Sequence, residues 1–246
     1  MNKHGPPTIL WDFDGTLAYH PTGWSTTLMQ LLDENVPGHS ARIEQIRVHM
    51  HQGFPWHSPD VPHHEISTPE AWWSLVEDLF IKALDAVGVE HERAVVIARL
   101  AHRRIVDPRS YHLYEDTLEV LQRLADRGWS HIILSNHVPE LAQIASALGL
   151  DRLVKRCISS AVIGYEKPHP EVFRIALAAA GDPADVWMVG DNLVADVAGA
   201  EALGLPAILV RSPRRDDVRY YAPNLREAAG IIETCSARSR GVASAP

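Results

Sequence analysis

The 246-residue chain lacks several features that mark whole classes of protein. Its two cysteines, Cys157 and Cys235, form no C-x-x-C pair, and its N-terminus does not resemble the charged region and apolar core of a signal peptide. No uninterrupted apolar run approaches the roughly 20 residues that cross a bilayer. We therefore expect a cytoplasmic protein with no membrane partner.

Positive charge is also scarce. Acidic residues outnumber basic ones by 31 to 23, which gives a formal net charge of −8, and only four of the basic residues are lysines. No basic block stands out, since Arg214 and Arg215 lie beside Asp216 and Asp217. This balance argues against nucleic acid as a partner. We therefore expect a small-molecule substrate, and a protein that is a monomer or a homodimer.

Short apolar strands alternate with helices along most of the chain. Strands are predicted at residues 8–11, 130–134, 186–189 and 207–210, with a weaker one near 157–159. Helices are predicted at residues 117–127, 140–148, 170–180 and 193–203, each followed by a glycine that ends it. The alternation predicts an α/β fold, a doubly wound Rossmann-like parallel sheet with helices on both faces.

Residues 18–110 interrupt this alternation. They contain no convincing strand, but helical patterns recur near residues 24–34, 40–50, 69–87 and 90–105, the third of which starts with Thr68 and Pro69. We therefore expect a discontinuous core, residues 1–17 and 111–235, with a helical cap domain of residues 18–110 inserted after the first strand. The small, polar residues 236–246 are predicted to be disordered.

Two aspartates, Asp12 and Asp14, follow the first strand in the stretch I-L-W-D-F-D-G-T-L. Because residues two apart on an extended chain project to the same side, both carboxylates can reach one small volume. Two anions that close repel each other, and a bound cation is the simplest remedy. Taken alone, however, the stretch is better explained as a strand that runs into an ordinary Asp-Gly turn.

Polar residues also stand after later strands and before the 170–180 helix, where ligands of doubly wound sheets bind. They are Ser135, Asn136, Lys167, Asp191, Asn192 and Asp196. Each has a simpler interpretation, as part of a turn, a helix cap or an exposed acid. Lys167 fits least well, because a cation near a helix start opposes the helix dipole.

In combination these residues resemble the four signatures of the haloacid dehalogenase-like (HAD) hydrolases. Residues 12–16 match D-x-D-G-T, and Ser135 matches the Ser or Thr that closes an apolar strand. Lys167 matches the lysine ahead of a helix, and residues 190–196 match G-D-x-x-x-x-D. The resemblance covers residues 8 to 233 and includes the helical insertion, and four motifs in order are far more specific than any one.

The resemblance implies magnesium-dependent phosphoryl transfer. Asp12 is expected to attack phosphorus and form an aspartyl phosphate, and Asp14 to protonate the leaving alcohol and then activate water. The expected Mg²⁺ ligands are Asp12, Asp191 and the Phe13-to-Asp14 segment, which supplies Asp14 or a backbone carbonyl. The residues expected to bind phosphate are Thr16, Ser135, Asn136 and Lys167. Asn192 and Asp196 are expected to lie behind the residues that contact substrate or metal, with Asp196 orienting Lys167 or a metal-bound water.

Among the reactions of the resembling family, phosphoric monoester hydrolysis fits best. Dehalogenases have no acid at the position of Asp14 and need no metal, and phosphonatases need a cap lysine, for which Lys82 on an amphipathic helix is the one candidate. A phosphomutase shares every core residue and stays an alternative, as does, less favourably, a 2-haloacid dehalogenase. A noncatalytic binding protein on this fold would be expected to have lost a core residue, and none is missing.

The substrate itself stays open. Ala18 and Tyr19 stand where many phosphatase relatives have an acidic residue and a serine or threonine, so no specific substrate transfers. Candidates for contact with the leaving group come from the cap domain, although packing within it explains them equally well. They are Trp24, His49, His51, Phe54, Trp56 and His57.

Overall fold

The computed structural model describes residues 5–242, with side chains as far as residue 236. Its main sheet consists of six strands in the order β5-β4-β1-β6-β7-β8, and every neighbouring pair is parallel. These strands are β1 (Thr8–Trp11), β4 (Ser130–Ser135), β5 (Val154–Ser159), β6 (Val186–Gly190), β7 (Ala207–Val210) and β8 (Tyr221–Ala222). The central strand β1 pairs with β4 on one side and β6 on the other, so the predicted doubly wound α/β fold is confirmed.

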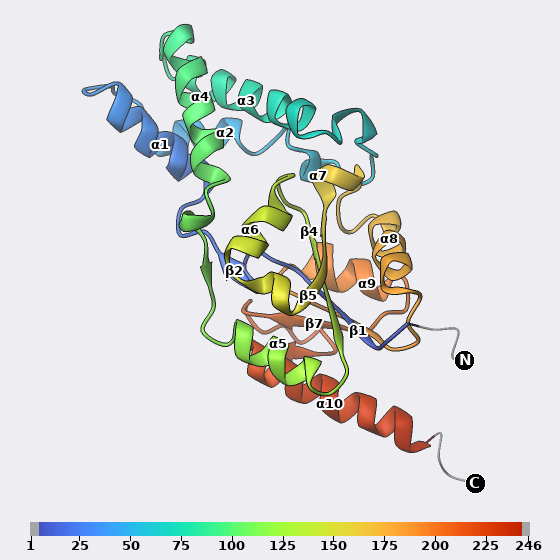
Figure 1. Ribbon diagram of the computed structural model, residues 1–246. Coiled ribbons are helices and arrows are strands. Elements are labelled where there is room, and N and C mark those ends of the chain that lie inside the picture. The colour runs from blue at the N-terminus through green and yellow to red at the C-terminus, as the bar shows by residue number, and fades with distance from the viewer. Residues whose placement is uncertain (1–4, 243–246) are drawn as a thin grey trace.

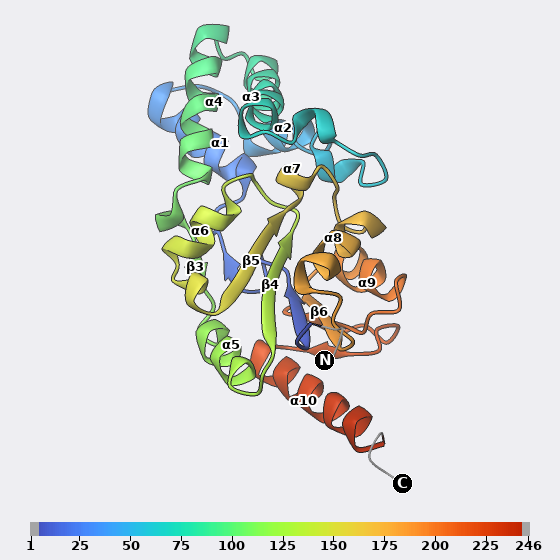
Figure 2. The ribbon, with the colours of Figure 1, turned by 45° about the vertical axis from the view of Figure 1, so that its right-hand side comes forward.

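Two apolar clusters cover the two faces of this sheet. Ile9 and Trp11 of β1 pack into one cluster, and Leu10 between them packs into the other, as the alternation of side chains along a strand requires. The first face carries α5 (Thr117–Ala125), α6 (Leu141–Ala147) and α10 (Leu225–Val242). The second carries α8 (Pro170–Ala180), the π-helix η5 (Leu193–Ala198) and α9 (Gly199–Glu201). Figure 2 shows α5 and α6 on one side of the strands and α8 and α9 on the other.

Four helices lie together beyond the carboxyl ends of the strands, near the short helix α7 (Ser160–Ile163) that follows β5 (Figure 1). They are α1 (Trp24–Asn35), α2 (Ile43–His49), α3 (Pro69–Ala86) and α4 (His91–Ile105), with the 3-10 turns η1 (Pro55–His57), η2 (His64–Ile66) and η3 (Pro108–Ser110). We call residues 20–110 the helical insertion. As predicted, Thr68 caps α3, since its Oγ1 accepts a hydrogen bond from the Ala71 amide.

The two segments that join the helical insertion to the sheet pair with each other. β2 (Ala18–Tyr19) and β3 (His112–Leu113) form a two-stranded antiparallel ribbon, and the Tyr114 amide donates to the Leu17 carbonyl at 3.2 Å. The two connections therefore lie side by side, and the first of them closely follows Asp14 along the chain. The entry and exit of the helical insertion are fixed to the same edge of the core.

The structure corrects three details of the sequence prediction. The helix predicted at residues 193–203 begins as the π-helix η5 and ends in the short α9, followed by Gly204 in the left-handed conformation. Helix α10 continues to Val242, so the disorder predicted for residues 236–242 is wrong; residues 243–246 lie outside the described part of the chain. Helices α7 and α10 and the 3-10 turns η1, η2, η3 and η4 (Leu150–Arg152) were not predicted. No helix within residues 5–242 is long and apolar enough to cross a membrane.

Candidate active site

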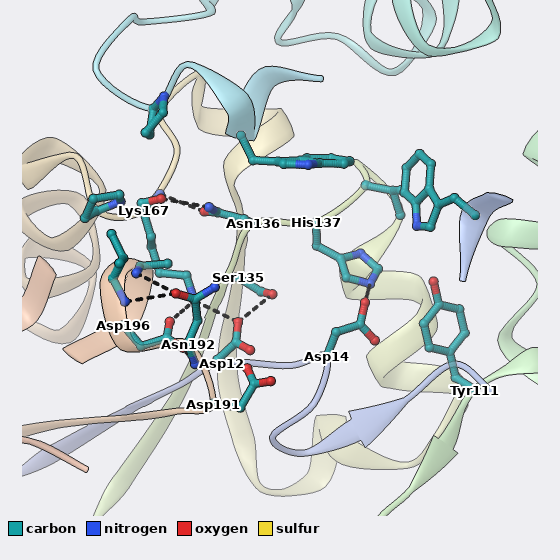
Figure 3. Close-up of a pocket in the computed structure, with 17 residues that line it drawn as sticks. Asp12, Asp14, Tyr111, Ser135, Asn136, His137, Lys167, Asp191, Asn192 and Asp196 are labelled. Atoms are coloured by element: carbon teal, nitrogen blue, oxygen red, sulfur yellow. Dashed lines mark hydrogen bonds and ion pairs between the residues drawn. The ribbon is translucent and has the colours of Figure 1, made fainter. Parts of the chain in front are cut away.

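A pocket of about 530 Å³ lies between the carboxyl ends of the strands and the helical insertion (Figure 3). Parallel strands end at one edge, so residues far apart in sequence converge there. Eight of the nine residues predicted for the site line it, namely Asp12, Asp14, Ser135, Asn136, Lys167, Asp191, Asn192 and Asp196.

Asp12 lies directly after β1 and is held by two donors. The Lys167 ammonium donates to its Oδ1 at 2.7 Å, and the Ser135 hydroxyl donates to the same oxygen at 2.9 Å. Among the described residues, none donates to Oδ2. The carboxylate is thus fixed by one oxygen and presents the other to the pocket, which is the arrangement that a nucleophile needs.

Lys167 is buried and lies between two carboxylates. Its Nζ is 2.7 Å from Asp12 Oδ1 and 2.5 Å from Asp196 Oδ1. Burial alone lowers the pKa of this lysine, but the two carboxylates outweigh burial and raise the pKa above its usual value, so the side chain stays charged. The Asn136 side chain fixes the lysine from behind, with its Nδ2 donating to the Lys167 carbonyl at 2.9 Å and its Oδ1 accepting from the Lys167 amide at 2.7 Å.

Asp196 has both carboxylate oxygens engaged by the protein. Oδ1 pairs with Lys167, and Oδ2 accepts a hydrogen bond from the Asn192 amide at 3.0 Å. Asn192 in turn caps η5, since its Oδ1 accepts from the amides of Val194 and Ala195. A Cβ at Gly190 would overlap the Asp196 carboxylate, so the end of β6 has to be glycine. Asp196 therefore holds Lys167, one of the two partners, Lys167 or a metal-bound water, that are predicted for it from the sequence.

Asp191 completes a group of three carboxylates. One oxygen each from Asp12, Asp191 and Asp196 lies within 4.8 Å of the others. Burial, followed by repulsion from Asp12 and Asp196, raises the pKa of Asp191 to about 7. Gly15, at φ 80°, leaves room for this side chain, because a Cβ there would overlap the Asp191 carboxylate.

These residues fit a magnesium ion. Carboxylate oxygens are the ligands that this hard cation prefers, and a dication would relieve the repulsion that raises the pKa of Asp191. Because both oxygens of Asp196 are engaged, the residues that would hold the ion are Asp12 and Asp191. Asp14 lies outside the three-carboxylate group, so its side chain is not part of the metal site that the geometry supports.

Asp14 faces a different partner. Its Oδ2 is 3.3 Å from Nε2 of His137, a buried histidine whose ring meets the Phe13 ring edge-on. Figure 3 shows Asp14 and His137 pointing toward each other, with Tyr111 beside them. Burial, with a further contribution from the Asp14 charge, raises the pKa of Tyr111 above its usual value, so the phenol stays neutral. Sequence reasoning missed His137 and Tyr111, although His137 directly follows Ser135-Asn136.

Thr16 does not fulfil its prediction. Its side chain is fully buried and does not line the pocket, and its carbonyl accepts a hydrogen bond from Arg211 Nε at 3.0 Å. The Gly15 turn directs this residue into the core, so its predicted contact with phosphate is wrong. Of the six candidates in the helical insertion, Trp24 and Trp56 line the pocket, whereas His49, His51, Phe54 and His57 do not.

The fold and the site thus combine a doubly wound sheet, a buried lysine between two aspartates and a group of carboxylates at the strand ends. Residues 6–204 match the sequence profile of the haloacid dehalogenase-like hydrolases. The chain belongs to this family.

The proteins to which this chain is similar are named for different activities. Phosphoserine phosphatase of Thermus thermophilus is 34% identical over 152 residues, which are 61% of this chain and 60% of the relative's length. Two solved structures, each 20% identical in sequence, share the fold. The 2-haloacid dehalogenase of Pseudomonas syringae pv. Tomato superposes with a TM-score of 0.67, and the match covers 93% of this chain and 98% of that chain. The HAD hydrolase YfnB of Bacillus subtilis, bound to magnesium, superposes with a TM-score of 0.68, and the match covers 93% of this chain and 99% of that chain.

Proposed function

We propose that the protein is a magnesium-dependent phosphoric monoester hydrolase that works through an aspartyl phosphate at Asp12. The observation that carries this proposal is Asp14, a second carboxylate at the pocket that pairs with His137 rather than with Lys167. An alkoxide is a poor leaving group and needs a proton, whereas a halide leaves without one. A positioned acid beside the nucleophile therefore favours phosphate esters over haloacids.

The chain's own residues can perform both halves of the reaction. Asp12 Oδ2 attacks phosphorus, while Lys167 and the Ser135 hydroxyl neutralise and orient the phosphoryl oxygens. Asp14 gives its proton to the departing alcohol and then takes a proton from the water that hydrolyses the aspartyl phosphate. Asp12 and Asp191 would hold magnesium, which supplies positive charge for the phosphoryl group when bound.

The helical insertion would act as a cap. We propose that it moves as a unit on the β2–β3 ribbon, so that closure excludes bulk water and opening releases alcohol and phosphate. The motivating observation is that Trp24 and Trp56 from the insertion line the same pocket as the strand-end carboxylates. The phosphomutase alternative differs in how well such closure excludes water from the phosphoenzyme.

Purified protein tested on a panel of phosphate monoesters decides between these activities. We expect release of inorganic phosphate that EDTA abolishes and added magnesium restores, and no release by Asp12→Asn. Halide release from 2-chloropropionate without magnesium would establish the dehalogenase instead. Phosphate migration within a substrate, with little free phosphate, would establish the phosphomutase.

A further inference from the structure

The pocket has two unlike walls. The strand-end wall carries the polar groups described above. The opposite wall is aromatic: Trp24 of α1 and Trp56 of η1 come from the helical insertion, and Tyr111 comes from the segment before β3. We call these three residues the aromatic wall.

The aromatic wall is preformed by packing behind it. The Trp24 and Trp56 rings meet edge to face with centroids 5.3 Å apart, and Trp56 stacks on the buried Phe54 ring at 4.6 Å. Trp24 also meets Phe54 edge-on at 5.2 Å. Both tryptophans keep part of their surface exposed and line the pocket. Large rings held in place in this way bind a planar apolar group at little entropic cost.

The charges of the pocket restrict what can accompany the phosphate. Lys167 is the one lysine or arginine among the described residues that line the pocket, and Asp12 and Asp196 already hold it. The helical insertion contributes Trp24, Trp56 and Pro59, none of which is charged. A second anionic group on the substrate would meet the Asp14 and Asp191 carboxylates, and the one histidine among the described lining residues, His137, already pairs with Asp14. Carboxylate-bearing and bisphosphate substrates are therefore disfavoured.

We infer that this pocket selects phosphate monoesters whose alcohol carries an uncharged aromatic ring. The ring stacks against the aromatic wall while the phosphate lies between Lys167 and Ser135. This inference rests on the proposed phosphatase function and adds the substrate class to it. It also explains why an insertion rich in histidine presents tryptophan, rather than a charged side chain, to the pocket.

Three esters of primary alcohols separate binding from leaving-group chemistry: 2-phenylethyl phosphate, ethyl phosphate and 2-carboxyethyl phosphate. Their alcohols need a proton to a similar degree, so differences in kcat/KM report recognition. We expect the phenylethyl ester to exceed the ethyl ester by about tenfold or more, mainly through KM, as one stacked and buried ring provides. The carboxyethyl ester should rank last.

Two substitutions of Trp56 locate this preference. Trp56→Leu keeps an apolar side chain but removes the ring, and should reduce the phenylethyl-to-ethyl ratio of kcat/KM at least threefold. Trp56→Arg should raise the carboxyethyl-to-phenylethyl ratio, a gain that a misfolded protein cannot produce. Ser58→Ala is the matched control, because the exposed Ser58 directly follows the same turn η1 but does not line the pocket, and it should keep both ratios.

The possible outcomes test the inferred substrate class separately from the phosphatase function on which it rests. If the wild type releases phosphate from the esters with no preference for the ring, or ranks the carboxyethyl ester first, the substrate class is wrong and the phosphatase stands. If no ester, 4-nitrophenyl phosphate included, yields phosphate in the presence of magnesium, the phosphatase proposal is overturned and the substrate class falls with it.

Discussion

Asp12 and Asp14 are two residues apart yet lie in different surroundings. Asp12 is nearly buried and bound by Lys167 and Ser135, whereas the Asp14 side chain is 46% exposed and pairs with His137. A carboxylate held by Lys167 and Ser135 is fixed in place for attack on phosphorus, while one near the pocket mouth lies within reach of substrate and water. The division of labour follows from these surroundings.

Substitution of Asp14 tests the acid role through the leaving group. We expect Asp14→Asn to slow the first step on ethyl phosphate about 100-fold or more, and the first step on 4-nitrophenyl phosphate much less, because that phenolate barely needs a proton. Single-turnover release of the alcohol measures this step directly. An equal loss on both esters would show that Asp14 does not act as the acid.

Glu166, next to Lys167, is a buried acid that the proposed chemistry does not use. Burial raises its pKa from 4.5 to about 7, opposed by a hydrogen bond from Ser160 and the charge of Lys167. Because the folded state holds the proton more tightly, this group's contribution to stability is full below about pH 4.5 and is lost as pH rises through 7.

Glu166→Gln should therefore remove part of the pH dependence of stability. We expect the free energy of unfolding of the variant to exceed that of the wild type at pH 8 by on the order of 3 kcal/mol, and to match it near pH 4.5. Urea titrations at the two pH values measure the difference. Glu201→Gln, at an exposed position of α9, is the control and should change neither value. A Glu166→Gln variant less stable than the wild type at pH 8 would contradict this account.

At the scale of elements, Arg211 joins four parts of the fold. It follows β7 with a positive φ of 55°, and its Nε donates to the Thr16 carbonyl of the loop after β1. Its guanidinium lies 3.7 Å from the centre of the Tyr114 ring and pairs with Asp116, a buried residue that also accepts from the Leu225 amide at the start of α10. The cluster fixes the loop after β1 and the exit from the helical insertion to the core.

Arg211→Met should lower the free energy of unfolding by about 3 kcal/mol, because it leaves the Asp116 carboxylate buried without its cation. Urea titration at pH 7 measures the loss. Arg214→Met removes an exposed arginine of the same loop and should change stability by less than about 0.5 kcal/mol. Similar values for the two variants would mean that Arg211 does not support the fold.

The secondary structure shows which helices and strands sequence patterns can predict. The five longer strands could be predicted because each is a short apolar run between turn signals, and most of the longer helices because their apolar residues recur on one face. Helices α7 and α10 were missed. β2, β3 and β8 are two residues long and exist only through pairing with distant segments, so no local pattern reveals them. The π-helix η5 escapes for a similar reason, since it includes Asp196, whose partner Lys167 lies elsewhere in the sequence.

The same limit applies to the site. Asp12, Asp14, Ser135, Lys167 and Asp191 could be predicted because their spacing resembles known signatures. The place of Thr16 depends on the direction of the chain after Gly15, and the contacts of His137, Tyr111 and Arg211 join segments far apart in sequence. Residues of that kind become visible only in three dimensions.

For the whole molecule, the helical insertion meets the core at separate contacts around the pocket. The Trp73 indole on α3 donates to both carboxylate oxygens of Glu140 at 3.1 Å, and the His63 amide donates to the Gly164 carbonyl at 2.7 Å. The described conformation therefore has the insertion against the core, the arrangement expected when a cap is closed.

Trp73→Phe removes one of these contacts while an aromatic ring stays in place. We expect it to favour the open arrangement and to raise KM for 2-phenylethyl phosphate about fivefold, as the loss of one hydrogen bond to a charged group allows. Trp129→Phe, buried away from the pocket, is the control and should leave KM unchanged. Small-angle scattering should report a larger radius of gyration for Trp73→Phe alone; an unchanged radius and KM would argue against hinged closure.

The most direct measurement for the central claim is the identification of the covalent intermediate. Asp14→Asn protein, in which water activation is slow, is mixed with 4-nitrophenyl phosphate and magnesium, quenched in acid and digested for mass spectrometry. The account predicts one added phosphoryl group on the peptide that contains Asp12, and none in the Asp12→Asn, Asp14→Asn double variant. Phosphate release by the wild type with no phosphorylated Asp12, or with the phosphoryl group on another residue, would contradict it.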